Sequence, residues 1–438
     1  DLGTFDTKLA LASEAGTGGY HAALELGSVA PAVPGSVSPP EEAYRPQLAY
    51  VQFHVAEFRK PEFEVEVKPT KESYVNGETI DTAVSADLFF CAPLAGAAVT
   101  WTATSSPYFF RPDGFSGFSF SDYTSAYDDR DGPYYEYQQH LRGTGEGKAG
   151  AQCTFSFSVP ADVANDRTSQ TFTLEANVTD QNGQAVGAFT AVHVHKGTFY
   201  IGLRPDDYVA TAGDDAKVNV VSVDPDGKTT GNVPVKVSIF ERKWRTVRVR
   251  DADGQQHFTS EHDDTLVQAL DVTTAADGKA LFSFKPKHSG EYYLLAEAKD
   301  AAGNSIVSST SVWASSGEYA SWRVGNDDTI ALVADRDSYK PGDMAKILVA
   351  APFTESRGLV TQERGRLLTS ELRDFATNSE VIEVPITEDH VPNIFVSVVL
   401  FKAPTAENPL PQVKLGIVEL KVSTDVKNLN IELKPARD

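Results

Sequence analysis

Two histidines two residues apart are the side chains in this sequence whose spacing best suits metal chelation. His193 and His195 stand in the run Ala191 to His195, where a strand would project both from one face. Neutral imidazole is a common metal ligand. A metal site needs at least a third protein ligand, and none is identifiable nearby. We therefore interpret both as exposed strand histidines and predict no metal site.

Two acidic turns resemble the start of a calcium-binding loop. They are Asp224-Pro225-Asp226-Gly227 and Asp251-Ala252-Asp253-Gly254. Neither has the third acidic position or the terminal glutamate at the spacing that such a loop needs. Asp-Gly between alternating strands is a strong hairpin signal. Hairpin turns therefore explain both segments better than a cation site.

The two cysteines, Cys91 and Cys153, are the only candidate thiol nucleophiles. A nucleophilic cysteine needs a histidine partner in a cleft, whereas Cys91 follows an apolar run at the end of an expected strand and Cys153 lies in an alternating one. The pair is better explained as a disulfide or as two packed thiols. The motifs Gly-x-Ser-x-Gly and His-Glu-x-x-His and a phosphate-binding glycine loop are absent. We predict that the chain has no catalytic residue, binds no cofactor and is not an enzyme.

Charge and hydropathy restrict the partners of the chain. Its formal net charge is -22, and a surface this acidic is repelled by nucleic acid and by anionic lipid. The sequence contains no run of 18 apolar residues that could cross a membrane. We expect neither nucleic-acid binding nor membrane contact.

Alternation with a period of two residues dominates the 438 residues. Apolar and polar side chains alternate along 62–67, 171–178 and 233–239, and Asn-Gly or Asp-Gly turns separate such runs. Each run can bury one face on a partner sheet. Only Arg366 to Phe375 is ambiguous between helix and strand. The pattern predicts an all-β chain of sandwich domains.

An internal repeat sets the expected domains. A tyrosine followed by a glycine-containing turn recurs at Tyr74, Tyr208 and Tyr339, where a turn between strands needs glycine. We expect domains at 61–196, 197–325 and 326–425. Residues 1–60 are expected to be the C-terminal part of a truncated domain, and residues 426–438 the first strand of a further one.

One stretch breaks the alternation. Residues 104–150 are rich in Tyr, Phe, Asp, Ser and Gly and show no period, which predicts a long insertion between strands. A binding loop and an ordered, self-packed flap are equally consistent with it. The proline-rich piece from Pro31 to Pro46 is expected to be a surface loop.

Several phrases together resemble the bacterial branch of the alpha-2-macroglobulin family. In chain order they span 55–63, 74–77, 90–97, 199–203, 338–343, 358–365 and 392–397. Any one of them is weak, but their order and spacing across nearly the whole chain make the match specific.

The resemblance implies a series of macroglobulin domains, each a fibronectin III-like, seven-stranded antiparallel sandwich. On the vertebrate count the chain would run from the end of the second domain to the start of the sixth. Cys91 stands where the family's third domain often has glycine, which suggests a disulfide to Cys153 that is particular to this chain. The family's Cys-x-Glu-Gln thioester motif is absent here, and its bait segment is expected beyond residue 438. No functional residue carries over.

The expected function is therefore that of a scaffold. The family entraps endopeptidases after they cut the bait, so endopeptidases are the implied partners, through the full-length protein. An extracytoplasmic location, periplasmic, secreted or surface-anchored, follows from the same resemblance. The alternative is the immunoglobulin-like repeat region of a surface adhesin or glycan-binding protein, since stacked sandwiches serve both roles.

Overall fold

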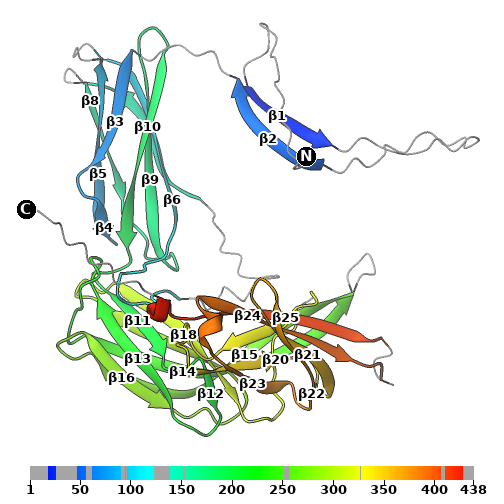
Figure 1. The fold of residues 1–438 in the computed structure, drawn as a ribbon. Coiled ribbons are helices and arrows are strands. Elements are labelled where there is room, and N and C mark those ends of the chain that lie inside the picture. Colours follow the sequence, from blue (N-terminus) through cyan, green and yellow to red (C-terminus); the bar gives the residue numbers. More distant parts are fainter. Residues whose placement is uncertain are drawn as a thin grey trace, which may run out of the picture. The chain divides into compact units, whose positions relative to one another are not determined.

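The part of the chain that the structure describes consists mainly of β-strands. The computed structural model describes residues 18–25, 47–55, 62–89, 94, 96–122, 139–150, 153–250, 256–325, 327–405 and 410–427. Within them the only helical pieces are two short 3-10 turns, η1 (Glu388–His390) and η2 (Asp425–Lys427). The prediction of an all-β chain is confirmed (Figure 1). No helix in this described part is long and apolar enough to span a bilayer.

The chain divides into two compact units, residues 1–64 with 88–92, and residues 65–87 with 93–438. In the first unit β1 (Gly18–Glu25) and β2 (Gln47–Val55) form an antiparallel pair. The assignment of residues 1–60 to a truncated domain stays a prediction, and the proline-rich loop at 31–46 lies outside the described residues.

Two sheets form from residues 63–195, with strand orders β3-β5-β8 and β4-β10-β9-β6-β7. The strands are β3 (Phe63–Pro69), β4 (Ser73–Val75), β5 (Thr79–Leu88), β6 (Ala98–Tyr108), β7 (His140–Lys148), β8 (Thr154–Pro160), β9 (Ser169–Thr179) and β10 (Ala185–His195). The predicted alternation is seen on β9, whose Phe172, Leu174, Ala176 and Val178 are fully buried. We refer to this pair of sheets as sandwich A.

Sandwich B uses residues 200–315, with strand orders β11-β13-β16 and β12-β18-β17-β14-β15. The strands are β11 (Tyr200–Pro205), β12 (Val209–Thr211), β13 (Ala216–Val223), β14 (Pro234–Arg250), β15 (Gln256–Thr273), β16 (Lys279–Phe284), β17 (Gly290–Lys299) and β18 (Ser305–Ser315). Alternate residues Val233, Val235, Val237 and Ile239 enter its core, as predicted. A bulge after Ile239 shifts the β14–β15 register.

Sandwich C uses residues 331–421, with strand orders β19-β20-β23 and β22-β21-β24-β25. The strands are β19 (Ala331–Ala334), β20 (Met344–Ala350), β21 (Ser356–Glu363), β22 (Leu367–Phe375), β23 (Ser379–Pro385), β24 (Asn393–Lys402) and β25 (Gln412–Lys421). The ambiguous segment from Arg366 to Phe375 is therefore an edge strand, β22. The domain limits at 61–196, 197–325, 326–425 and 426–438 stay predictions.

The repeated turn has the geometry that its glycine requires. Gly77, Gly213 and Gly342 have φ angles of 91°, 93° and 100°, which side chains rarely adopt. Their backbone N–H groups donate to the carbonyls of Ala161, Pro286 and Ile386 respectively. Beside each turn the chain pairs in parallel with the last strand region of its sandwich, at Tyr74↔Val194, Val209↔Trp313 and Tyr339↔Val422. The same local structure thus recurs in all three sandwiches.

The boundaries of the expected insertion at 104–150 were wrong at both ends. Residues 104–108 belong to β6 and residues 140–148 form β7. Three alternate glycines of β7 hid its period: a Cβ at Gly143 or Gly145 would meet the ring of Trp101, and one at Gly147 the ring of Phe155. Residues 123–138 lie outside the described part.

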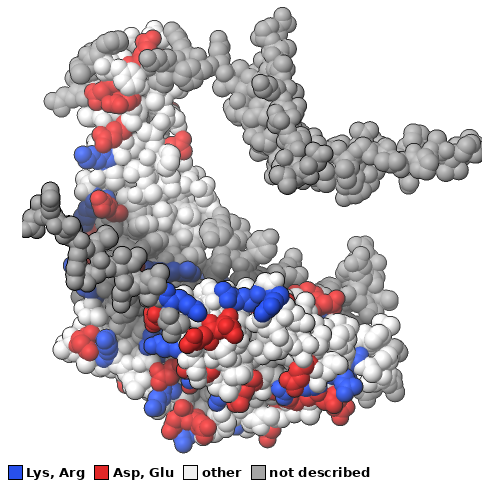
Figure 2. All heavy atoms as spheres, in the orientation of Figure 1, with Lys and Arg blue, Asp and Glu red and all other residues white. Residues whose placement is uncertain are grey.

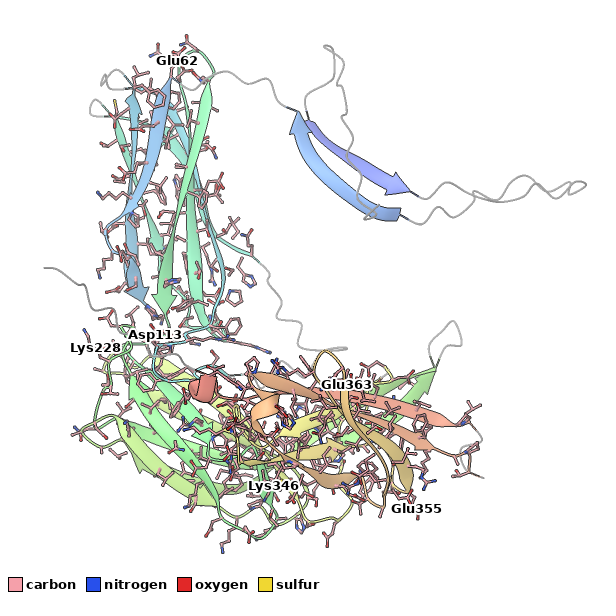
Figure 3. The ribbon with its side chains drawn as sticks, in the orientation of Figure 1. Glu62, Asp113, Lys228, Lys346, Glu355 and Glu363 are labelled. Carbon is pink, nitrogen blue, oxygen red and sulfur yellow. The ribbon has the colours of Figure 1, made fainter. Side chains whose placement is uncertain are left out.

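Residues 109–122, which we name the crossing segment, pack on sandwich B. Phe110 and Phe120 are buried with Tyr200, Val221 and Val223 of that sandwich. Ser119 and Leu203 exchange two backbone hydrogen bonds. A Cβ at Gly227 would lie 3.3 Å from Pro112. Figure 3 labels the chain neighbours of these two residues, Lys228 and Asp113. The described segment is an ordered flap: its phenylalanine rings contact one another, as in the pairs Phe110–Phe120 and Phe115–Phe118, and the segment also packs against the next sandwich.

Charged side chains are distributed over the surface. On the face that Figure 2 shows, acidic and basic residues are interspersed, with acidic ones frequent, in keeping with the net charge of -22. Such a surface favours solubility.

Candidate functional site

The two strand histidines lie where sandwich A meets the crossing segment and sandwich B. Their ring centroids are 6.5 Å apart on β10. His195 is 4% exposed, so its interpretation as an exposed histidine was wrong. Its Nδ1 lies 2.6 Å from the hydroxyl of Tyr200, and His193 stacks on Tyr108 at 4.0 Å. His195 is buried because the end of β10 packs against sandwich B, where Tyr200 lies. The sequence of one strand does not show such a contact with another domain.

Acidification is expected to weaken this junction. Burial, and then the nearby His193, lower the pKa of His195 to about 4. The unfolded state, with a pKa near 6.5, binds the proton more tightly, so stability is complete above about pH 6.5 and falls toward pH 4. The loss due to His195 should be about 3 kcal/mol. Unfolding free energies of the wild type and of His195→Gln at pH 7 and pH 4 measure it; an identical pH dependence in the two proteins would contradict it.

Cys153 is a buried thiol in this structure. It forms no disulfide with a described residue, and burial, followed by the nearby Asp87 carboxylate, raises the pKa of its thiol. A thiol with a raised pKa is a poor nucleophile. Cys91 lies outside the described residues, so a Cys91–Cys153 bridge in an oxidising compartment stays a prediction.

The first acidic turn is a hairpin turn, as predicted. Asp224 Oδ1 accepts hydrogen bonds from the backbone N–H groups of Asp226 and Lys228, and Gly227 has a φ of 80°. The carboxylate therefore closes its own turn. The second acidic turn, 251–254, lies outside the described residues. In the described part no three His, Cys, Asp or Glu side chains are grouped to hold a metal ion.

The outer face of the larger sheet of sandwich B carries the most elaborate polar network. Arg242 is 1% exposed, and its Nε and Nη2 donate to the two carboxylate oxygens of Asp264 at 2.8 and 2.7 Å. Burial alone would raise the pKa of Asp264, but the hydrogen bonds and charge of Arg242 outweigh it and lower that pKa. The buried Glu291 accepts hydrogen bonds from Trp244 Nε1 at 3.1 Å and from Ser311 Oγ at 3.0 Å.

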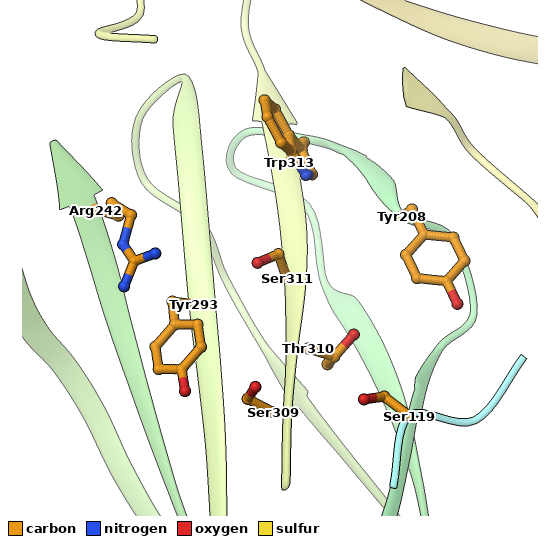
Figure 4. A pocket seen from close by; sticks show the side chains of 8 residues that line it. All are labelled: Ser119, Tyr208, Arg242, Tyr293, Ser309, Thr310, Ser311 and Trp313. Carbon is orange, nitrogen blue, oxygen red and sulfur yellow. The ribbon is translucent and has the colours of Figure 1, made fainter. Parts of the chain in front are cut away.

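A polar cavity of about 270 Å³ opens on this face (Figure 4). Its lining consists of Ser119, Tyr208, Arg242, Tyr293, Ser309, Thr310, Ser311 and Trp313. Figure 4 shows one terminal nitrogen of Arg242 on the side of Ser311. Burial, and then Asp337, raise the pKa of Tyr208 to about 12, so its hydroxyl stays neutral at pH 7. The described lining has no histidine, carboxylate or cysteine.

A second cavity of about 390 Å³ lies between sandwiches B and C. Its walls include Trp244, Trp313 and Trp322, with four charged side chains, those of Glu291, Arg323, Asp327 and Lys414. Beside it the sandwiches are joined through Trp322, whose Nε1 donates to the Asn378 carbonyl at 2.7 Å. Sequence reasoning missed both cavities, because their residues come from separate strands whose pairing no local motif announces.

Two family models match the chain in order along sandwiches B and C. The model described as bacterial macroglobulin domain 6 matches residues 202–315. The model described as alpha-2-macroglobulin bait region domain matches residues 330–438. The expectation that the cleavable segment itself lies beyond residue 438 stays a prediction.

Curated relatives carry the same family name. An alpha-2-macroglobulin homolog of a Nostoc species is 23% identical over 398 residues, which is 88% of this chain and 20% of the relative. A homolog from Yersinia pestis is 22% identical, over 63% of this chain and 14% of the relative. The chain thus spans a fifth or less of these relatives.

Solved structures of bacterial alpha-2-macroglobulins also align with the chain. The native conformation of the Escherichia coli protein aligns at 17% identity and a TM-score of 0.44, over 87% of this chain and 24% of that one. A Salmonella protein reacted with methylamine aligns at 15% and 0.44, over 93% and 25%. Both TM-scores lie below 0.5, and the family assignment rests on the sequence matches.

These matches identify the tandem sandwiches as macroglobulin domains. The chain belongs to the bacterial alpha-2-macroglobulin family.

Proposed function

We propose that this chain is a structural part of a broad-spectrum endopeptidase inhibitor that works outside the cytoplasm, and that it has no enzymatic activity of its own. The observation that carries the proposal is the pair of family models that match sandwiches B and C in order. The inhibitor would act through its full-length form, since the chain spans 20% of the Nostoc relative.

The contacts between the sandwiches support a scaffold. Backbone hydrogen bonds join the crossing segment to β11, and another joins Tyr208 N to the Asp335 carbonyl between sandwiches B and C. Arg336 reaches from sandwich C to Asp207 of sandwich B at 3.1 Å. Interfaces with specific backbone and side-chain bonds restrain domain motion more than a plain linker would. A frame of this kind could hold a cleavable segment in place and enclose a protease.

Digestion assays with substrates of two sizes test the proposal. The full-length protein should slow the digestion of a large protein substrate by several endopeptidases and leave a small chromogenic peptide cleavable. A protease enclosed in a cage still admits the small peptide to its active site, whereas a protease whose active site is blocked cleaves neither the peptide nor the large protein.

The chain alone is the matched control for this assay. It should neither slow either digestion nor incorporate a small amine nucleophile, because it lacks the Cys-x-Glu-Gln motif. Full-length protein that protects neither substrate would defeat the inhibitor proposal. Inhibition of peptide cleavage by the chain alone would instead show that it contains an inhibitory loop.

A further inference from the structure

The cavity between sandwiches B and C gathers three of the four tryptophans in the chain. Trp244 comes from β14, Trp313 from β18 and Trp322 from the connection between the sandwiches. Its volume of about 390 Å³ is within the range of ligand sites. Flat indole faces in a concave site favour a flat ring as the occupant. We refer to this cavity as the tryptophan crevice.

Arg323 places in the crevice a guanidinium that has no hydrogen-bond acceptor among the described residues. Its Nε is buried without a hydrogen-bond partner. Its guanidinium carbon makes a cation–π contact with Trp244, 5.9 Å from the centroid of that ring. By contrast, the guanidinium of Arg242, two residues before Trp244 on β14, donates two hydrogen bonds to Asp264. A buried N–H without an acceptor is unfavourable, so an acceptor brought by a ligand would stabilise Arg323.

The other charged groups of the crevice already have partners. The carboxylate of Glu291 accepts hydrogen bonds from Trp244 and Ser311. Lys414 Nζ donates to the Asp327 carbonyl and lies 3.7 Å from a carboxylate oxygen of Asp328. The Asp327 carboxylate, also in the lining, accepts hydrogen bonds from the backbone N–H and the hydroxyl of Thr329. Among the described charged groups of the lining, Arg323 is therefore the cation available to a ligand. A planar guanidinium prefers a carboxylate, which it can bind through two parallel hydrogen bonds.

We propose that the tryptophan crevice binds an aromatic ring that carries a carboxylate close by. The ring lies against the indoles, and the carboxylate accepts hydrogen bonds from Arg323. A free aromatic acid and the C-terminal phenylalanine, tyrosine or tryptophan of a peptide share this chemistry. The net charge of -22 disfavours unspecific binding of carboxylates elsewhere on the surface.

A fluorescence titration of the whole chain tests the proposal, because three of its four tryptophans line the crevice. The probe is N-acetylphenylalanine, which does not absorb where tryptophan is excited. It should give a saturable change with a Kd of about 1 mM, as expected of a ligand this small. Its C-terminal amide should bind about tenfold more weakly, since the charge-assisted hydrogen bonds to Arg323 are lost. N-acetylalanine, which lacks the ring, should give no saturable change.

A substitution at Arg323 gives the second arm. Arg323→Gln should weaken binding of the acid about tenfold and leave binding of the amide unchanged. Folding should be preserved, because Arg323 makes no hydrogen bond or ion pair with the described residues. The matched control is Arg245→Gln, an exposed arginine of β14 that does not line the crevice and pairs with Asp263; it should change neither affinity.

A tripeptide of two alanines followed by phenylalanine separates the two sources of the ligand. Binding at least as tight as that of N-acetylphenylalanine assigns the site to peptide C-termini; much weaker binding assigns it to free aromatic acids. Equal affinity for acid and amide, full binding of the acid by Arg323→Gln, or no saturation at about ten times the expected Kd overturns the proposal.

Discussion

Replacing Arg242 by methionine is expected to lower the free energy of unfolding of sandwich B by about 3 kcal/mol. Arg242 is 1% exposed, and its guanidinium binds both carboxylate oxygens of Asp264. It also lies over the ring of Tyr293, 4.9 Å from the centroid. Methionine fills the volume but removes both arginine hydrogen bonds from the partly buried Asp264, which keeps only the contact with His262 Nδ1 at 3.2 Å among its described charged neighbours. The effect falls at the lower end for a buried pair because the Asp264 side chain keeps 24% exposure.

Hydrogen exchange of the β14 and β17 amides measures this local loss within a chain of several domains. The matched control is Arg245→Met on the same hairpin, whose pair with Asp263 is exposed at 65% and 60%. An exposed pair contributes little, so this control should stay within about 0.5 kcal/mol of the wild type. The double variant Arg242→Met/Asp264→Leu should recover most of the loss. A double variant as unstable as Arg242→Met alone would show that packing, and not the carboxylate deprived of its arginine, sets the cost.

Local patterns in the sequence predicted the strands that line the cores. On β9 and β14 the apolar residues alternate, and the structure buries those residues. The repeated glycine also predicted the turn between the strands correctly. The turn requires a positive φ, which only a residue without Cβ adopts easily. Such features depend on neighbours in the chain, so the sequence displays them directly.

The repeated tyrosine shows where that reasoning stops. In sandwiches A and C the tyrosine hydroxyl accepts a hydrogen bond from the backbone N–H three residues upstream, at Lys71 and Arg336. In sandwich B that upstream residue is Pro205, which has no N–H to donate. The hydroxyl of Tyr208 instead donates to the Gly117 carbonyl of the crossing segment, at 3.1 Å. The proline was visible in the sequence, but the new partner, 91 residues away, was not.

The cavities and the polar network depend on strand register. Arg242 faces Asp264 because β14 and β15 pair in one register after the bulge at Ile239, and Glu291 reaches Trp244 from the neighbouring β17. A shift of one residue would turn each side chain to the other face of the sheet. Nothing local to these residues specifies the register, so no sequence pattern announced the site.

Phe110 should have the second large effect, because it couples sandwich A to sandwich B. Its ring is 5% exposed, stacks on Tyr200 at 4.0 Å and meets Phe120 edge-on at 5.5 Å. Truncation of a buried phenylalanine to alanine costs about 3 to 5 kcal/mol. Most of that loss should fall on the crossing segment and not on the core of either sandwich.

The readout of Phe110→Ala is the exchange of two amides that the crossing segment protects. Leu203 N donates to the Ser119 carbonyl, and Ser309 N donates to the Ser121 carbonyl. A local loss of about 3 kcal/mol should speed their exchange about 100-fold, while amides inside β9 keep their protection. The matched control is Phe189→Ala on β10, whose ring is 75% exposed and whose loss should change exchange by about twofold or less. Unchanged exchange at Leu203 and Ser309 would mean that the backbone bonds hold the crossing segment without Phe110. Faster exchange throughout β9 would mean that the crossing segment is part of the core of sandwich A, and that the two sandwiches do not unfold separately.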